Sequence, residues 1–291
     1  MKRRELDIVI LSDTHLGTYG CHARELLQYL KSIKPAMLIL NGDFIDIWQF
    51  RKSYFPKEHL EVIQRILKMS MKDTKVYYIT GNHDDALRRY SDFSAGNMHL
   101  RDKLVLHLNG KKYWIFHGDI FDLTIKYSPL LARLGGKGYD WLIWLNRFVN
   151  QVRQRLGKPR MSFAHKVKYR VKEAVKFVGN FEETAIRLAA EQGYDYVICG
   201  HIHRPQMRVV RQTGRQVTYL NSGDWVENLT ALEYQYGKWT LYEYEEGSYQ
   251  FDPAEGDADE REDLSLPVEL LLKGFSTNGK SGQKNKQAAG D

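Results

Sequence analysis

The chain has 291 residues, 43% of them hydrophobic, and a net charge of +7 from 43 Lys and Arg against 36 Asp and Glu. This length allows one large domain or two small ones, with enough apolar residues for a sizeable core. No apolar stretch approaches the roughly 18 to 20 continuous residues of a membrane-spanning helix. The two cysteines, Cys21 and Cys199, are too few for a disulfide framework, so we expect both to be small core residues.

The chain begins with MKRRELDIVILSD, in which basic residues precede about six apolar positions. This apolar run is too short for the core of a signal peptide. We therefore interpret residues 6–11 as a first strand, and this interpretation predicts a cytoplasmic protein.

Short apolar runs then alternate with longer segments of helical spacing. Residues 36–40 and 75–80 are continuous apolar runs bounded by polar turns, as in buried strands. Residues 22–33 and 57–71 instead repeat their apolar positions with the period of a helix. Strands that alternate with helices predict an α/β fold.

After residue 100 the pattern changes to β-hairpins. An Asn-Gly pair at 109–110 separates two alternating runs, as in a tight hairpin turn. A second β-rich stretch follows Tyr196 and contains another turn near Gly237. Two strand-rich halves with a helical section between them predict two packed sheets rather than one open sheet.

Residues 121–190 predict a helical lid inserted between strands. Their basic part, residues 147–176, has ten Lys and Arg against one acid, Glu173, a net charge of +9. The apolar part of the insertion contains Trp141, Leu142, Trp144, Leu145 and Phe148. Two interpretations stay open: these aromatics pack on the body of the domain, or they bind acyl chains while the basic residues meet phosphate or an anionic membrane surface.

The last part of the chain differs in composition from the rest. Residues 252–263 carry seven acids and one Arg, and a Gly-, Lys-, Gln- and Asn-rich segment follows. Such a composition is typical of a disordered tail. We therefore expect one domain over residues 1–251, with the insertion inside it, and a disordered tail over residues 252–291.

Polar side chains follow the predicted strands at the points where they end. They are Asp13 and His15 in LSDTHLG, Asp43 in NGDFID, Asn82 and His83 in GNHDD, His117 in HGD, and His201 and His203 in GHIH. The carboxyl ends of strands are where α/β proteins build their sites, and residues two apart on an extended strand point to the same face. Oxygen and nitrogen ligands without thiolate suit two divalent ions, most simply Mn²⁺, with Fe²⁺ or Zn²⁺ as alternatives.

At these motifs, between residues 8 and 205, the chain resembles the calcineurin-like metallophosphoesterases. The resemblance implies a four-layer α/β sandwich in which helices flank two mixed β-sheets, and a dinuclear metal centre. It also implies an in-line attack on phosphorus by a hydroxide that bridges the metals. The ligands implied for one metal are Asp13, His15 and His203, those for the other are Asn82, His117 and His201, and Asp43 bridges the two.

The same resemblance gives roles to residues that do not bind the metals. His83 would donate a proton to the leaving oxygen or stabilise the transition state, and Asp84 would orient His83. Asn221 and Asp224, in LNSGDW, would support the ligands from a last loop.

Within the superfamily the layout is most similar to the UDP-2,3-diacylglucosamine pyrophosphatases of lipid A synthesis. That branch implies hydrolysis of a lipid-linked nucleotide to UMP and 2,3-diacylglucosamine 1-phosphate, at the inner face of the cell membrane. Its best-known members carry Arg where this chain has His83. The alternatives are a soluble phosphoesterase that acts on nucleotides or other phosphodiesters, and a non-catalytic scaffold on the same fold. Nucleic acid is not expected as a partner, because no stacking motif accompanies the basic run.

Overall fold

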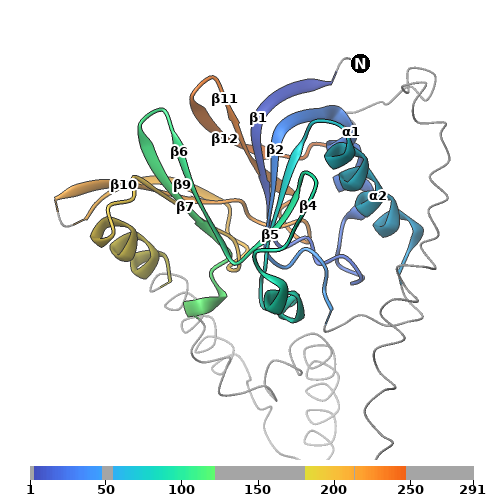
Figure 1. Cartoon of the computed structure of the whole chain (residues 1–291), viewed down its shortest axis with the longest axis horizontal. Helices are drawn as coiled ribbons and strands as arrows, with labels where there is room; N and C mark the ends of the chain where they lie inside the picture. The colour runs from blue at the N-terminus through green and yellow to red at the C-terminus, as the bar shows by residue number, and fades with distance from the viewer. Residues whose placement is uncertain (1–2, 48–54, 122–180, 213, 247–291) are drawn as a thin grey trace, which may run out of the picture. The chain divides into compact units, whose positions relative to one another are not determined.

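The computed structural model describes residues 3–47, 55–121, 181–212 and 214–246, which lie in one compact unit. In this part of the chain the strands form two sheets (Figure 1). The first sheet has the order β12-β11-β1-β2-β3-β5-β4. In that order, the strands are Lys238–Glu243, Thr230–Gln235, Arg4–Leu11, Ile33–Asn41, Lys75–Ile79, Met98–Arg101 and Ser94–Ala95.

The second sheet has the order β6-β7-β8-β10-β9. In that order, its strands are Lys103–Leu108, Lys111–Phe116, Tyr196–Cys199, Arg215–Asn221 and Gln206–Gln212. Parallel pairs lie in the middle of each sheet, β1-β2-β3-β5 in the first and β7-β8-β10 in the second, and antiparallel pairs lie outside them. Both sheets are therefore mixed, as predicted.

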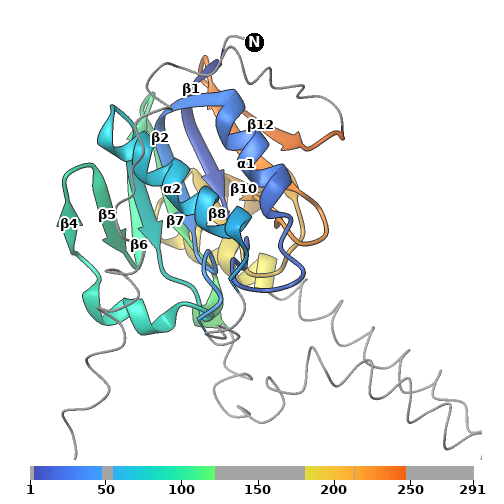
Figure 2. The ribbon, with the colours of Figure 1, turned by 90° about the vertical axis from the view of Figure 1, so that its right-hand side faces the viewer.

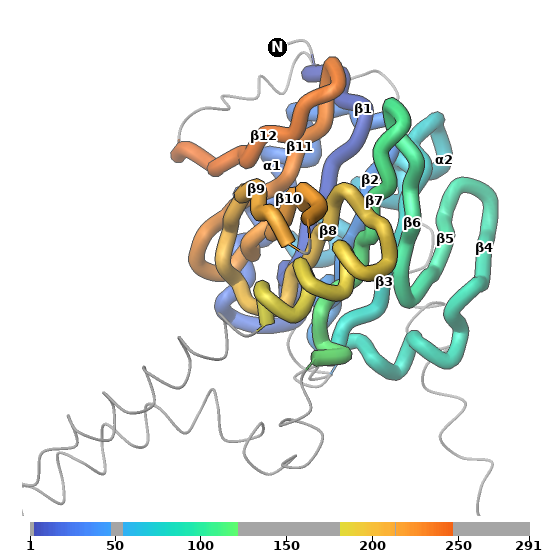
Figure 3. Tube along the Cα trace, turned by 90° about the vertical axis from the view of Figure 1, so that its left-hand side faces the viewer, coloured from blue at the N-terminus to red at the C-terminus, as the bar shows by residue number. Residues whose placement is uncertain are grey.

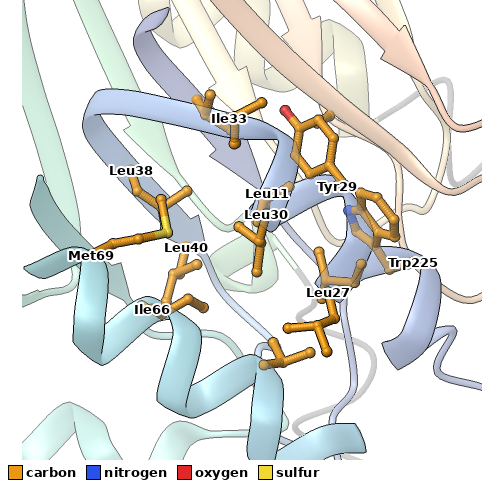
Figure 4. Close-up of a cluster of buried hydrophobic side chains, with 14 of the residues drawn as sticks. Leu11, Leu27, Tyr29, Leu30, Ile33, Leu38, Leu40, Ile66, Met69 and Trp225 are labelled. Carbon is orange, nitrogen blue, oxygen red and sulfur yellow. The ribbon is translucent and has the colours of Figure 1, made fainter. Parts of the chain in front are cut away.

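Two helices cover the outer face of the seven-stranded sheet, α1 over Ala23–Ser32 and α2 over Lys57–Met71 (Figures 1 and 2). Their apolar positions recur with helical spacing, so each helix has one buried stripe. Leu30 of α1 and Ile66 of α2 pack with Leu38 of β2, and Trp225 lies against the ring of Tyr29 (Figure 4). This cluster fixes both helices on the sheet.

The two sheets pack face to face through a second apolar cluster. Ile10 and Ile39 from the first sheet meet Ile115 and Leu220 from the second. A helix over residues 181–191 covers the other face of the second sheet (Figure 3). Its Ala185 and other small side chains pack there in a third cluster. Helices, sheet, sheet and helix make four layers, and the predicted α/β sandwich is confirmed.

The predicted helices and strands agree closely with the observed ones in the first 120 residues. The Asn-Gly hairpin joins β6 to β7, and the turn at Gly237 joins β11 to β12. Of the predicted insertion, residues 122–180 lie outside the described residues, and so does the whole predicted tail. None of the described helices is long and apolar enough to cross a membrane.

Both cysteine thiols should react slowly in the folded protein. Burial, and then the carboxylate of Glu25, raises the pKa of Cys21 to about 12, and burial raises the pKa of Cys199 well above its ordinary value. Since the thiolate is the nucleophile, a chromogenic disulfide reagent at pH 8 should detect no fast thiol until a denaturant exposes both. Rapid reaction of even one equivalent before denaturation would contradict this expectation.

Candidate metal centre

The ends of six parallel strands meet where the two sheets face each other. The polar residues follow the ends of β1, β2 and β3 in the first sheet and of β7, β8 and β10 in the second. Hydrogen bonds join the two edges: Ser12 Oγ lies 2.7 Å from Ser222 Oγ, and Asn41 Nδ2 donates to the Phe116 carbonyl over 3.2 Å. The strand-end motifs of both halves are thus brought to one place.

The backbone at these strand ends is strained. Among the described residues, nine that are not glycine have a positive φ, a region that side chains rarely adopt. Five of the nine come from the predicted site: Asp13, His15, Asp43, His201 and His203. Strain of this kind persists only where the surrounding structure imposes it, and it clusters at functional sites.

Two glycines allow the chain segments to approach closely here. A Cβ on Gly81 would lie 2.6 Å from the Asp43 backbone nitrogen and 2.9 Å from Cδ2 of His117. A Cβ on Gly200 would lie 2.6 Å from Oδ2 of Asp13. Real Cβ atoms do not make contacts this short, so the strand-end packing requires glycine at both positions.

One group of side chains joins the end of β1 to the loop after β8. Asp13, His15 and His203 each offer one ligand atom, and these atoms all lie within 4.8 Å of one another. Nε2 of His203 lies 3.3 Å from Oδ1 of Asp13 and 3.4 Å from Nε2 of His15. The spacing suits three ligands of a single ion.

A second group is formed by Asp43, His117 and His201, again with ligand atoms within 4.8 Å of one another. Nδ1 of His117 lies 2.9 Å from the carbonyl of Asn41. Because a carbonyl only accepts, Nδ1 is the donor, and Nε2 is left to face Oδ2 of Asp43 at 3.2 Å. This is the tautomer that a metal-binding histidine needs.

Two buried atoms, one on His117 of this group and one on Asn82, are unsatisfied. Within the described residues, neither Oδ1 of Asn82 nor Nε2 of His117 has a hydrogen-bond partner. Buried polar atoms without partners cost free energy and need an explanation. A divalent cation would satisfy both, so the residues fit the metal centre that the sequence motifs predict. Cys199 packs in the apolar cluster under the helix at 181–191 and adds no thiolate.

The electrostatics of the centre favour positive charge. Burial would raise the pKa of Asp13, but His117 and His203 outweigh it and bring that pKa down to about 2. Burial would likewise raise the pKa of Asp43, yet His117, His83 and His15 hold it below its ordinary value. The carboxylates thus stay ionised inside the protein, which is the state in which they bind cations.

Asp46 is a member of the site that the sequence interpretation missed. Its carboxylate is buried, and Oδ2 lies 2.9 Å from Nδ1 of His83 and 3.6 Å from Nδ1 of His15. Asp46 lies within NGDFID, three residues after Asp43. A second carboxylate so close to Asp43 in a strand-end motif is a signal from which Asp46 could have been predicted.

The expected pairing of Asp84 with His83 needs correction, because Asp84 has other partners. Oδ2 of Asp84 accepts hydrogen bonds from the Tyr78 hydroxyl at 2.6 Å and the Phe44 backbone at 3.1 Å. Oδ1 accepts from the Gly81 backbone at 2.5 Å. Asp84 therefore braces the loops after β2 and β3, and Asp46 is the carboxylate hydrogen-bonded to the ring of His83.

The last loop carries Asn221 and Asp224, whose side chains contact the segment after β8. Nδ2 of Asn221 donates to the Gly200 carbonyl over 2.9 Å, next to His201. Oδ1 of Asp224 accepts from the backbone of the following turn, and Oδ2 lies 3.8 Å from Nδ1 of His203. Both side chains thus contact the loop that carries two of the histidines.

The comparisons with known proteins agree with this architecture. The family described as calcineurin-like phosphoesterase matches residues 6–205. The chain is 26% identical over 246 residues to UDP-2,3-diacylglucosamine hydrolase of Aliivibrio fischeri, covering 82% of this chain and 99% of that protein. It is 28% identical over 222 residues to the protein of the same name from Azotobacter vinelandii, covering 75% and 90%.

Solved structures match more distantly. The phosphoesterase YfcE from E. coli aligns with 82% of this chain and 99% of its own, at 12% identity and a TM-score of 0.38. A Vps29 variant from Entamoeba histolytica aligns with 81% and 90%, at 12% identity and a TM-score of 0.39.

Two facing sheets with Asp, Asn and His at their strand ends define the class of metal-dependent hydrolases built on a four-layer sandwich. The chain belongs to the calcineurin-like phosphoesterase family, because the model of that family matches residues 6–205, which are more than half of the chain. It is therefore a hydrolase that uses divalent metal ions.

Proposed function

We propose that this hydrolase is a dinuclear pyrophosphatase that cleaves UDP-2,3-diacylglucosamine into UMP and 2,3-diacylglucosamine 1-phosphate. The observation that carries the proposal is the similarity to hydrolases of that name over nearly their whole length, up to 99%. We place the catalytic domain over residues 1–251 and treat residues 252–291 as a tail outside it. A lipid-linked substrate would bring the protein to the inner, anionic face of the cell membrane.

Asp13, His15 and His203 would hold one ion, and Asn82, His117 and His201 the other. The position of Asp43 supports its role as the bridge, because its carboxylate belongs both to the group with His117 and His201 and to a group with His15 and His83. The ligand set favours Mn²⁺, with Fe²⁺ or Zn²⁺ as alternatives.

When bound, the ions supply Lewis acidity toward phosphoryl oxygens and lower the pKa of a coordinated water toward neutrality. The protein's own contribution lies in His83. Its backbone nitrogen donates to Oδ1 of Asp43 over 2.8 Å, and its ring lies edge-on to His15 at 4.7 Å. With Nδ1 donating to Asp46, Nε2 would donate a proton to the leaving oxygen as the P–O bond breaks and water adds to phosphorus.

Replacing Asp46 by Asn should lower kcat by about 10- to 100-fold, the usual cost of losing a carboxylate behind a catalytic or metal-binding histidine. The amide keeps the shape of the side chain and loses the charge that orients His83 and His15. Steady-state kinetics with saturating Mn²⁺ measures the effect. Asp73→Asn, an exposed change in the turn before β3, is the matched control. Wild-type kcat in the Asp46 variant would show that the contact is dispensable.

Substrate choice is tested by measuring UMP release from UDP-2,3-diacylglucosamine in mixed micelles with Mn²⁺. Nucleoside polyphosphates, a cyclic nucleotide and an aryl phosphodiester serve as parallel substrates. The proposal expects the lipid-linked nucleotide to give the highest kcat/KM. If only the soluble esters turn over, the lipid assignment is wrong, although the phosphoesterase chemistry stands.

One observation favours a second candidate, a phosphoesterase of soluble phosphodiesters. The chain carries His83 beside the metal ligands, and a proton donor there matters most when the leaving group is an alkoxide rather than a phosphate. The same set of parallel substrates separates the two candidates.

A further inference from the structure

Arg88 links two turns that carry metal ligands on different sheets. It lies in η1, the short helix Asp85–Tyr90 that follows Asn82 and His83 after β3. Its Nη2 donates to Oδ2 of Asp119 over 2.8 Å, and Asp119 begins η2, two residues after His117 at the end of β7. Figure 1 shows both turns at the same end of the sheets, η1 in teal and η2 in green.

The other nitrogens of the guanidinium have acceptors as well. Nη1 lies 3.1 Å from Oδ1 of Asp85. Nε lies 3.3 Å from Oγ1 of Thr80 and 3.5 Å from Oδ1 of Asp102. Thr80 itself donates to Asp102 over 2.8 Å. The planar group is therefore held in one orientation by acceptors on several sides, a geometry that lysine could not reproduce.

This network differs from an ordinary surface ion pair. The side chain of Asp119 is only 10% exposed and that of Arg88 is 30% exposed, so water screens the link only in part. One guanidinium also faces three carboxylates, those of Asp85, Asp102 and Asp119. Loss of the guanidinium would leave the largely buried Asp119 carboxylate without its cation, whereas Asp85 and Asp102, 57% and 47% exposed, keep their contact with water.

The link adds to the contacts that already join the sheets here, which are apolar packing, as between Ile39 and Ile115, and hydrogen bonds such as the one from Asn41 to the Phe116 carbonyl. Apolar packing is not directional and does not by itself fix the position of one strand end against another. Asn82 and His117 come from opposite sheets, and their unsatisfied buried atoms must reach the same ion. The ring of His117 is already held against the first sheet by the Asn41 carbonyl, and the charge-assisted contact of Arg88 with Asp119 adds a second directional link, between the turns that follow Asn82 and His117.

We propose that Arg88 is a positioning residue that ties the η1 and η2 turns together, so that Asn82 and His117 bind one metal ion of the pair. The inference rests on the proposed metal assignment, and it adds a function for two side chains, Arg88 and Asp119, that touch no metal. Arg88 is expected to strengthen the binding of one of the two ions. It should not affect the binding of the other ion, whose proposed ligands are Asp13, His15 and His203.

The test is calorimetric titration of chelator-treated protein with MnCl₂. Wild type should bind two ions, and Arg88→Met should bind one as wild type does and the other about 10- to 100-fold more weakly. Asp119→Asn, which cuts the same link from the other side, should weaken the same ion. Arg89→Met is the matched control, because Arg89 is the exposed neighbour whose guanidinium lies over the ring of Tyr90, and it should bind both ions normally.

The double variant Arg88→Met with Asp119→Asn should bind the weakened ion no more weakly than the worse single variant, since one link can be removed only once. Unchanged affinity for both ions in Arg88→Met and Asp119→Asn would overturn the proposal. Equal weakening of both ions together with a lower melting temperature would also overturn it, because that result indicates general loss of structure. If wild type binds two ions but cleaves no phosphoester, the proposed function fails while the role of Arg88 stands.

Discussion

Asp43→Asn should abolish the hydrolysis of every phosphoester that the wild-type protein cleaves. The Asp43 carboxylate is buried, lies 3.2 Å from Nε2 of His117 and accepts the backbone hydrogen bond of His83. Its ligand atom belongs to one group with His117 and His201 and to another with His15 and His83. Losing a carboxylate that orients a metal ligand costs about 10- to 100-fold in activity, so losing the proposed bridging ligand itself should cost more than that. The measurement is kcat/KM for each substrate at saturating Mn²⁺.

Asp92→Asn provides the matched control for this change. Asp92 has the same side chain on a left-handed backbone, with φ 75° against 52° for Asp43, but its side chain is 90% exposed. Its replacement should leave kcat/KM unchanged. A folded Asp43 variant that retains activity within a few-fold of wild type would refute the assignment of Asp43 as the bridge.

His83→Ala should produce a loss that depends on the leaving group. If His83 donates a proton to the departing oxygen, the loss should reach about 10²- to 10⁴-fold for an alkyl phosphodiester, the range for general acid catalysis. It should be much smaller for a nitrophenyl phosphodiester, whose leaving group needs no proton. Comparing kcat for the two esters in the variant and in wild type gives the ratio directly.

His107→Ala is the control for this comparison, because His107 is exposed on β6 and belongs to none of the ligand groups. It should leave both rates unchanged. Equal losses on both esters in His83→Ala would mean that the ring stabilises the transition state or orders the site without donating the proton.

Much of the fold could be predicted because the local signals agree with the tertiary structure. The buried strands are continuous apolar runs, and the hairpin turns carry Asn-Gly or Gly at the positions where φ is positive. The strand order could not be predicted. That β11 pairs with β1, more than two hundred residues away in the chain, depends on long-range packing that leaves no local trace.

The candidate site was visible in the sequence because its residues stand at strand ends, and parallel strands bring such ends together. The roles of neighbouring carboxylates were not visible. Asp84 follows His83 directly, yet its carboxylate turns to Tyr78, while Asp46 reaches His83 from another strand end. Proximity in the chain favoured Asp84 as the partner of His83, and only the tertiary contacts show that the partner is Asp46.

The same holds for the paired arginines at 88 and 89. Both follow the metal motif, and nothing in LRRY separates them. In the short helix η1, Arg88 turns toward the second sheet and Arg89 lies over Tyr90 in solvent. The direction of a side chain on an irregular turn depends on its surroundings, and a sequence pattern does not encode it.

The most direct test of the metal centre is anomalous diffraction at the manganese edge from crystals of the chelator-treated protein soaked with Mn²⁺. Two peaks are expected about 3.5 to 4 Å apart, one on each side of the Asp43 carboxylate, with Asn82 and His117 beside the same peak. Phosphoester hydrolysis should return only as both peaks fill. A single peak, peaks away from Asp43, or full activity without bound metal would contradict a dinuclear phosphoesterase.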